Sequence, residues 1–150
     1  MKTKVLMVCL GNICRSPLAE GILQSKVDPD KVFVDSAGTA GYHVGNPPDS
    51  RSIAVARKYG LDISRQKCRR FSAIDFLEFD HIYVMDRSNY STVASLAANA
   101  MGASKIKLLL EEVDLGIDEV PDPYYGGEDG FEKVYQMIDK ACEAIAKKLN

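Results

Sequence analysis

The chain has 150 residues, of which 46% are hydrophobic and 27% are charged, and its formal net charge is −2. This length and apolar content predict one domain, residues 1–150, that buries a sizeable core. The small net charge gives no argument for nucleic acid as a partner. No apolar run approaches the ~20 residues that span a bilayer, so we expect no membrane partner either.

Cysteine usage indicates a reducing environment. Four cysteines are spread along the sequence without a framework of close pairs: Cys9, Cys14, Cys68 and Cys142. Because secreted domains of this size use paired cysteines, we expect a cytoplasmic protein. We expect Cys68 to be a surface thiol and Cys142 a core thiol.

The first elements of the chain enclose a candidate anion site. Residues 4–9 form an apolar run of strand length, and a helix is predicted from residue 17 to about residue 27. Pro17 suits the first helical position, where its missing N–H would have no partner. A loop that ends at a helix N-terminus presents unpaired N–H groups and the positive end of the helix dipole. The sequence therefore predicts that this loop binds an oxyanion.

We call residues 9–16 the anion loop, and each of its residue types suits that task. A cysteine at a helix N-terminus near an arginine ionises readily, so Cys9 is a candidate thiolate nucleophile. Arg15 offers a planar fork that matches two phosphate oxygens. Gly11 and Asn12 tolerate the positive φ that turns successive amides toward one centre. Ser16 is placed to donate a hydrogen bond to the Cys9 sulfur.

The rest of the sequence alternates strand-like and helix-like stretches, which predicts an α/β fold. Strands are predicted at residues 32–34, 81–85 and 105–110, and helices at about 49–59, 72–78, 88–101 and 131–149, with a long loop over 111–130. Right-handed crossovers then give a parallel sheet with helices on both faces. Ligands bind such sheets at the carboxyl ends of the strands, where Cys9, Ser36 and Asp86 are all expected.

Displacement of a phenolate from phosphorus also needs an acid, which contributes about 10²–10⁴ in rate. The best candidate is Asp122, in Val-Pro-Asp-Pro-Tyr-Tyr-Gly-Gly over residues 120–127. Flanking prolines stiffen its position, and the two tyrosines are suited to line a slot for an aromatic ring. The alternative is a solvated loop carboxylate, because nine acidic residues lie between positions 111 and 132. Sequence statistics alone favour that alternative.

The anion loop also resembles a known motif. Cys-Leu-Gly-Asn-Ile-Cys-Arg-Ser-Pro over residues 9–17 is similar to the phosphate-binding loop of the low-molecular-weight protein tyrosine phosphatases. Three later segments resemble further motifs of that family in the same order: Asp35-Ser36-Ala37-Gly38-Thr39, Met85-Asp86 and Asp122-Pro123-Tyr124-Tyr125. The resemblance covers essentially the whole chain. It implies a flavodoxin-like, four-stranded parallel sheet and the hydrolysis of protein phosphotyrosine without a metal or other cofactor.

The resemblance also assigns roles to residues. It implies a phosphocysteine intermediate on Cys9, phosphoryl binding by Arg15, and Asp122 as general acid and then base. The other residues that would bind the phosphoryl group are Leu10, Gly11, Asn12, Ile13, Cys14 and Ser16. Around them it places loop-supporting residues and cleft-wall tyrosines, namely Ser36, Asp86, Tyr124 and Tyr125. Expected ligands are phosphotyrosine proteins and small aryl phosphates, with inorganic phosphate or vanadate as inhibitors.

Two positions leave alternatives open. Cys14 is either a small residue that packs the loop or a redox thiol that forms a reversible disulfide with Cys9. Gln66 stands where many members of the family carry a histidine, and a glutamine cannot titrate near neutrality. The chain's own histidines, His43 and His81, are expected to be structural or solvent-facing.

Two other activities suit such a loop. A thiol-dependent arsenate reductase needs a further redox cysteine pair after the third strand, and none occurs between Met85 and Cys142. A phosphoarginine phosphatase tends to carry threonine where Ile13 stands, whereas isoleucine suits an aromatic ester better. The sequence therefore favours a tyrosine phosphatase.

Overall fold

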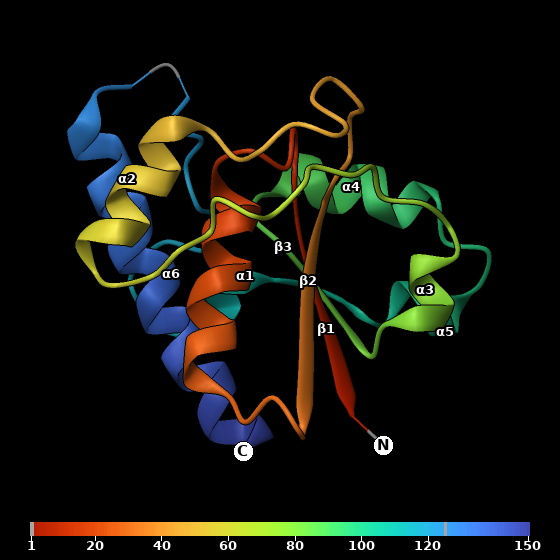
Figure 1. Ribbon diagram of the computed structural model, residues 1–150. Helices are drawn as coiled ribbons and strands as arrows, with labels where there is room; N and C mark the ends of the chain where they lie inside the picture. Colours follow the sequence, from red (N-terminus) through yellow and green to blue (C-terminus); the bar gives the residue numbers. More distant parts are fainter. Residues whose placement is uncertain (1, 125) are drawn as a thin grey trace.

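The computed structural model describes residues 2–124 and 126–150. In this part of the chain four strands form one parallel sheet in the order β2-β1-β3-β4 (Figure 1). The strands are β1 (Thr3–Cys9), β2 (Val32–Gly38), β3 (His81–Val84) and β4 (Ile106–Leu108). The expected single-domain α/β fold with a four-stranded parallel sheet is thus confirmed.

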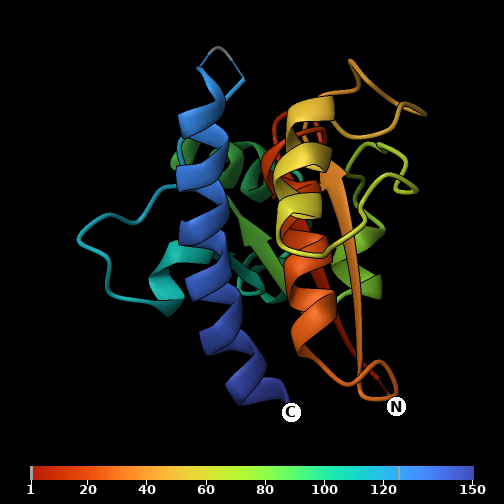
Figure 2. The ribbon, with the colours of Figure 1, turned by 60° about the vertical axis from the view of Figure 1, so that its left-hand side comes forward.

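Helices cover both faces of the sheet. One face carries α1 (Arg15–Lys26), α2 (Ser50–Lys58) and α6 (Glu128–Leu149), which Figure 2 brings forward. The other face carries α3 (Asp75–Glu78), α4 (Arg87–Ser95) and α5 (Ala100–Ala103). Side chains of β1 alternate between the two cores, with Val5 and Met7 on the α1 side and Leu6 and Val8 on the other. A strand buried on both faces explains the unbroken apolar run in the sequence.

Several boundaries differ from the expected ones. Helix α1 begins at Arg15, so Pro17 is its third residue; proline is tolerated there because the first four N–H groups of a helix lack intrahelical partners. Strand β2 extends to Gly38. The helix expected over 88–101 is two helices, because the Asn99 side chain accepts a hydrogen bond from Gly102 N and starts α5.

The C-terminal part also differs in detail. The predicted strand 105–110 is shorter, because a 3-10 helix, η1 (Leu109–Glu112), takes over after β4. Helix α6 begins three residues earlier than expected, after Gly127.

The carboxyl ends of β1, β2 and β3 lie at one edge of the sheet, below the loops at the top of Figure 1. Strand β1 lies between β2 and β3, so the chain passes to β2 on one side of β1 and later to β3 on the other side. In such sheets this reversal of strand order opens a crevice at the carboxyl end of the central strand, here β1. Gly38 of β2 pairs with Cys9 there. A Cβ on Gly38 would lie 2.9 Å from the Leu10 carbonyl oxygen and 3.0 Å from Asn12 N, so only glycine lets the anion loop pack on β2.

Candidate active site

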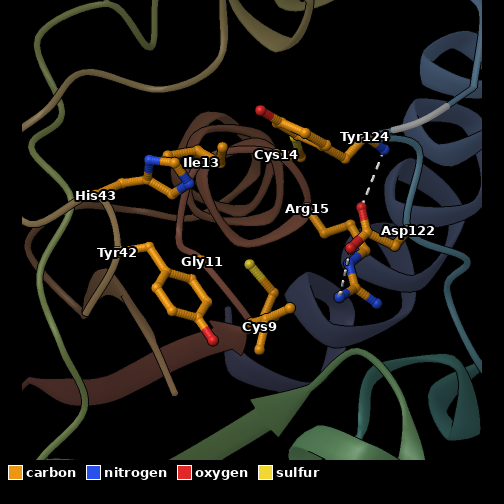
Figure 3. A pocket seen from close by; sticks show the side chains of 10 residues that line it. Cys9, Gly11, Ile13, Cys14, Arg15, Tyr42, His43, Asp122 and Tyr124 are labelled. Atoms are coloured by element: carbon orange, nitrogen blue, oxygen red, sulfur yellow. Dashed lines mark hydrogen bonds and ion pairs between the residues drawn. The ribbon is translucent and has the colours of Figure 1, made fainter. Parts of the chain in front are cut away.

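A cavity of about 290 Å³ opens at the end of β1, directly over the anion loop (Figure 3). The Cys9 sulfur points into it from below, although the residue as a whole is only 2% exposed. Loops from three parts of the chain complete the walls. The lining residues are Cys9, Leu10, Gly11, Ile13, Cys14, Arg15, Tyr42, His43, Asp122 and Tyr124.

Asn12 holds the anion loop in shape. Its φ of 57° is the left-handed conformation that the loop needs, and its side chain is buried. The amide Nδ2 donates to Ser16 Oγ at 2.8 Å and to Ser36 Oγ at 3.0 Å. The amide Oδ1 accepts from Arg69 N at 3.0 Å, and the Asn12 carbonyl accepts from Cys68 Sγ at 2.7 Å. Hydrogen bonds on both sides of this residue therefore fix one loop conformation.

Two expectations about this region were wrong. Gly11 was expected to share the positive φ, but of the two residues only Asn12 has it. Gly11 is needed for space instead, because a Cβ there would lie 3.2 Å from His43 Cδ2. Cys68 was expected at the surface, but it is buried beneath the loop, where its thiol contacts Asn12. Cys142 lies in the core as expected.

The Cys9 sulfur has a hydroxyl neighbour in the first turn of α1. Ser16 Oγ lies 3.0 Å from Cys9 Sγ, and Asn12 donates to that same oxygen. Because Asn12 donates to it, the Ser16 hydroxyl has its own proton available for the Cys9 sulfur at 3.0 Å or for the Ala37 carbonyl at 3.5 Å. The start of α1 lies beside the sulfur and adds the positive end of its dipole. A hydroxyl group and a helix N-terminus therefore both lie next to the Cys9 sulfur.

Arg15 is a buried cation at the side of the cavity. Its Nη1 donates to Asp86 Oδ2 at 2.7 Å and to the Val120 carbonyl at 2.9 Å. Burial lowers the pKa of Arg15, but the negative charges of Cys9 and Asp86 outweigh this, and the net pKa is raised. Asp86, two residues after β3 at the N-cap of α4, therefore fixes the direction of a guanidinium that stays charged.

Asp122 lies at the mouth of the cavity, with its side chain 44% exposed. Its Oδ2 is 3.7 Å from Arg15 Nη2, and its Oδ1 accepts from Tyr124 N at 3.0 Å (Figure 3). The Tyr124 ring lines the cavity and packs under the Arg51 guanidinium, whose Cζ is 5.4 Å from the ring centroid. The fold thus brings Asp122 and Tyr124 to the cavity, as expected, whereas Tyr125 lies outside the described residues.

Cys14 is a second thiol on the cavity wall. Burial, reinforced by the nearby Asp49 charge, raises its pKa to about 12, so it stays protonated near neutral pH. A neutral thiol is a poor nucleophile, so Cys14 is expected to react slowly.

Sequence reasoning missed two residues of the cavity wall. Tyr42 and His43 come from the loop after β2, and both line the cavity opposite Asp122 (Figure 3). His43 was expected to be structural or solvent-facing. The one available signal was that this loop follows a strand whose carboxyl end meets the site edge.

Gln66 packs against the outer side of α1. Its Nε2 donates to the Pro17 carbonyl at 3.0 Å, whereas its buried Oε1 has no hydrogen-bond partner among the described residues.

In the described parts of the chain no three His, Cys, Asp or Glu side chains gather as metal ligands. No helix there is long and apolar enough to cross a bilayer.

Comparison with known proteins gives a consistent result. Residues 4–150 match the family described as low molecular weight phosphotyrosine protein phosphatase. The low molecular weight protein-tyrosine-phosphatase YfkJ of Bacillus subtilis is 42% identical over 94% of this chain and 92% of its own.

Two crystal structures are also similar. A protein tyrosine phosphatase from Entamoeba histolytica, with Hepes in its active site, matches with a TM-score of 0.93 and 38% identity over 99% of this chain and 97% of its own. Vibrio vulnificus Wzb, in complex with benzylphosphonate, matches with a TM-score of 0.87 and 35% identity over 99% of this chain and the full length of its own.

Proposed function

This chain belongs to the low molecular weight phosphotyrosine protein phosphatase family, and on that premise we propose that it hydrolyses protein phosphotyrosine through a phosphocysteine on Cys9. The observation that carries the proposal is the cavity itself. It places a sulfur nucleophile, a buried arginine and an exposed carboxyl group around one space of about 290 Å³.

In the first step the Cys9 thiolate attacks phosphorus, and the bond from phosphorus to the phenolic oxygen breaks. The backbone N–H groups of the anion loop and the Arg15 guanidinium surround the equatorial oxygens, where charge spreads in the transition state. Protonated Asp122, at the cavity mouth, gives its proton to the departing phenolate. The product of this step is a phosphocysteine and a free tyrosine side chain.

In the second step water attacks the phosphocysteine. Asp122, now a carboxylate, takes a proton from that water, and the sulfur leaves as a thiolate. The Ser16 hydroxyl, 3.0 Å from the sulfur, stabilises this leaving group. Inorganic phosphate then departs and the starting state is restored.

The ion pair of Arg15 with Asp122 bears on substrate entry. Their closest atoms, 3.7 Å apart, lie beside the place of the phosphoryl group. An ionised Asp122 repels a phosphate dianion, whereas a protonated Asp122 does not and is also the form that acts as acid. Substrate binding and proton donation therefore favour the same, neutral form of Asp122.

The cavity walls support an aromatic ester as substrate. Tyr42 and Tyr124 lie on opposite sides of the opening, and the Ile13 side chain lines the cavity wall beside His43. These groups are apolar or aromatic and offer a phenyl ring contacts on several sides. A phosphoarginine substrate would bring a polar guanidino group against Ile13, which has no hydroxyl to meet it.

The arsenate reductase alternative has little support in the thiol positions. Cys142 is fully buried in the core, and the Cys68 thiol lies beneath the anion loop, where it donates a hydrogen bond to the Asn12 carbonyl. Neither lines the cavity. Hydrolysis needs no further thiol, so it is the better account of this site.

We also propose that Cys14 protects Cys9 from irreversible oxidation. A peroxide would oxidise the Cys9 thiolate to a sulfenic acid, and the Cys14 thiol would then form a disulfide with it as water leaves. Both thiols line the same cavity. The proposed setting is a reducing cytoplasm, which the four free cysteines support and where that disulfide is reversible.

The direct test compares three phosphopeptides of one sequence that carry phosphotyrosine, phosphoserine or phosphoarginine. We expect the highest kcat/KM for phosphotyrosine, turnover of small aryl phosphates, inhibition by vanadate and inorganic phosphate, and no effect of a chelator. A higher kcat/KM for phosphoarginine would contradict the substrate assignment.

A further inference from the structure

A carboxyl group outside the proposed mechanism is connected to the anion loop. Glu20 lies in the second turn of α1 and is partly buried. Its Oε1 accepts a hydrogen bond from Ser36 Oγ at 2.6 Å. Ser36 Oγ accepts in turn from Asn12 Nδ2 at 3.0 Å. A path of hydrogen bonds therefore leads from the Glu20 carboxyl into the loop that carries Cys9.

The directions of these hydrogen bonds are fixed. Because Asn12 Oδ1 accepts from Arg69 N, the amide nitrogen of Asn12 must face the two serine hydroxyls. One N–H goes to Ser16, whose hydroxyl lies 3.0 Å from Cys9 Sγ. The other goes to Ser36, whose single proton is then directed outward to the carboxyl. Hydrogen bonds from Asn12 thus lead in two directions, through Ser16 to the Cys9 sulfur and through Ser36 to the Glu20 carboxyl group.

Burial and the neighbouring groups act on the pKa of Glu20 in opposite directions. Burial raises its pKa, the bond from Ser36 lowers it, Asp35 raises it and Arg69 lowers it, with a net rise to about 7. The Arg69 guanidinium is shared, because it pairs with Asp35 at 3.1 Å and with Asp75 at 3.1 Å. Its charge is therefore only partly available to the Glu20 carboxylate.

Gln66, a neighbouring side chain that packs against α1, adds no charge near Glu20. Gln66 lies against this helix, with its amide on the Pro17 carbonyl and 3.8 Å from the place of a Cβ on Gly21. A glutamine stays neutral at every working pH. The charged side chains that act on Glu20 are therefore Asp35 and Arg69.

We propose that Glu20 is a positioning residue of the phosphatase reaction, and that its charge, transmitted through Ser36 and Asn12, sets how tightly the anion loop holds a phosphoryl group. When Glu20 is neutral, its side chain does not oppose the electrostatic attraction between the anion loop and a bound oxyanion. An ionised Glu20 places a negative charge behind the loop and weakens oxyanion binding. The inference rests on the proposed function in taking the phosphoryl group as the ligand, but oxyanion binding is measurable without turnover.

The test uses Glu20→Gln, which keeps the shape of the side chain and removes its titration. Sulfate is the probe, because it stays a dianion across the whole pH range. At about pH 5.5 the variant and the wild type should bind sulfate equally; at about pH 8.5 the variant should bind about three- to fivefold more tightly. The matched control is Glu78→Gln, an exposed glutamate on α3, whose affinity ratio to wild type should not change with pH. A Glu20→Gln ratio that is also independent of pH would overturn the proposal.

A second measurement needs only the wild-type protein. Coupling between two sites is reciprocal, so bound sulfate must raise the titration midpoint of Glu20 by about 0.5–0.7 pH units if the affinity ratio is three- to fivefold. Carbon-13 NMR of the glutamate carboxyl groups reports this midpoint with and without sulfate. An unchanged midpoint overturns the inference even if the variant does not fold. Loss of phosphotyrosine hydrolysis together with an intact coupling would remove the proposed function and leave the role of Glu20 in place.

Discussion

The two loops that meet at the cavity are held in different ways. In the anion loop Cys9, Asn12 and Arg15 are each 2% exposed, and their side chains contact Ser16 in α1, Ser36 in β2 and Asp86 at the start of α4. In residues 119–127, which we call the acid loop, the Asp122 side chain is 44% exposed and the Tyr124 residue 38%. The proposed nucleophile and its anion site are therefore built into the core, whereas the proposed acid lies at the surface. Substitutions of the buried anion-loop residues should change stability and chemistry together, whereas substitution of the exposed Asp122 should change chemistry alone.

The largest expected effect is that of Cys9→Ser. A serine hydroxyl is not ionised at this site, so turnover of phosphotyrosine peptide should fall by on the order of 10⁴-fold or more. Sulfate or phosphate binding should persist, because the loop N–H groups and Arg15 remain. Loss of oxyanion binding in a folded variant would contradict the assignment of separate roles to sulfur and loop.

Asp122→Ala tests the acid loop. Without a proton donor, kcat for phenyl phosphate should fall by about 10²–10⁴, whereas p-nitrophenyl phosphate, with its better leaving group, should lose far less. The free energy of unfolding should stay within about 0.5 kcal/mol of wild type, because Asp122 is largely exposed. Equal losses for the two esters would remove Asp122 from the acid role.

A pair of glycine substitutions compares the loops by the same chemical change. Gly38→Ala places a methyl group 2.9 Å from the Leu10 carbonyl oxygen and 3.0 Å from Asn12 N, so it should push the anion loop out of position. We expect a loss of about 1–3 kcal/mol in the free energy of unfolding and a clear fall in kcat/KM. Gly127→Ala, beyond the acid loop's aspartate, meets no described atom within 4 Å and should be nearly neutral. Similar effects for both would show that the loops do not differ as described.

The smallest effect concerns the two thiols of the anion loop. The pKa of Cys14 is raised to about 12, so below that pH its neutral thiol predominates and reacts slowly with alkylating reagents. Iodoacetate near neutral pH should therefore modify Cys9 first, and mass spectrometry of the digested protein should show little carboxymethyl-Cys14. Preferential labelling of Cys14 would contradict this order of reactivity.

The sequence predicts best the parts of the site whose residues are close together in the chain. The anion loop was predictable because its cysteine, asparagine, arginine and serine lie within eight consecutive positions and between a strand and a helix. Tyr42, His43 and the contact of Glu20 with Ser36 were not, because each joins segments that only the fold brings together. The burial of Cys68 was missed for the same reason.

Helix boundaries show the same limit. Pro17 correctly indicated that a helix begins near this position. The observed start at Arg15 depends on how the loop closes over the anion site. The division of the predicted helix 88–101 depends on one side-chain cap, at Asn99, which competes with a continuous apolar pattern.

The central claim is that Cys9 carries the phosphoryl group during turnover. Rapid acid quenching of the enzyme with a phosphotyrosine peptide, followed by peptide mapping under conditions that preserve thiophosphate esters, tests it most directly. The account predicts a phosphate on the peptide that contains Cys9, which accumulates further in Asp122→Ala when the leaving group is good. A phosphate on any other residue, or turnover without a phosphoenzyme in both proteins, would contradict it.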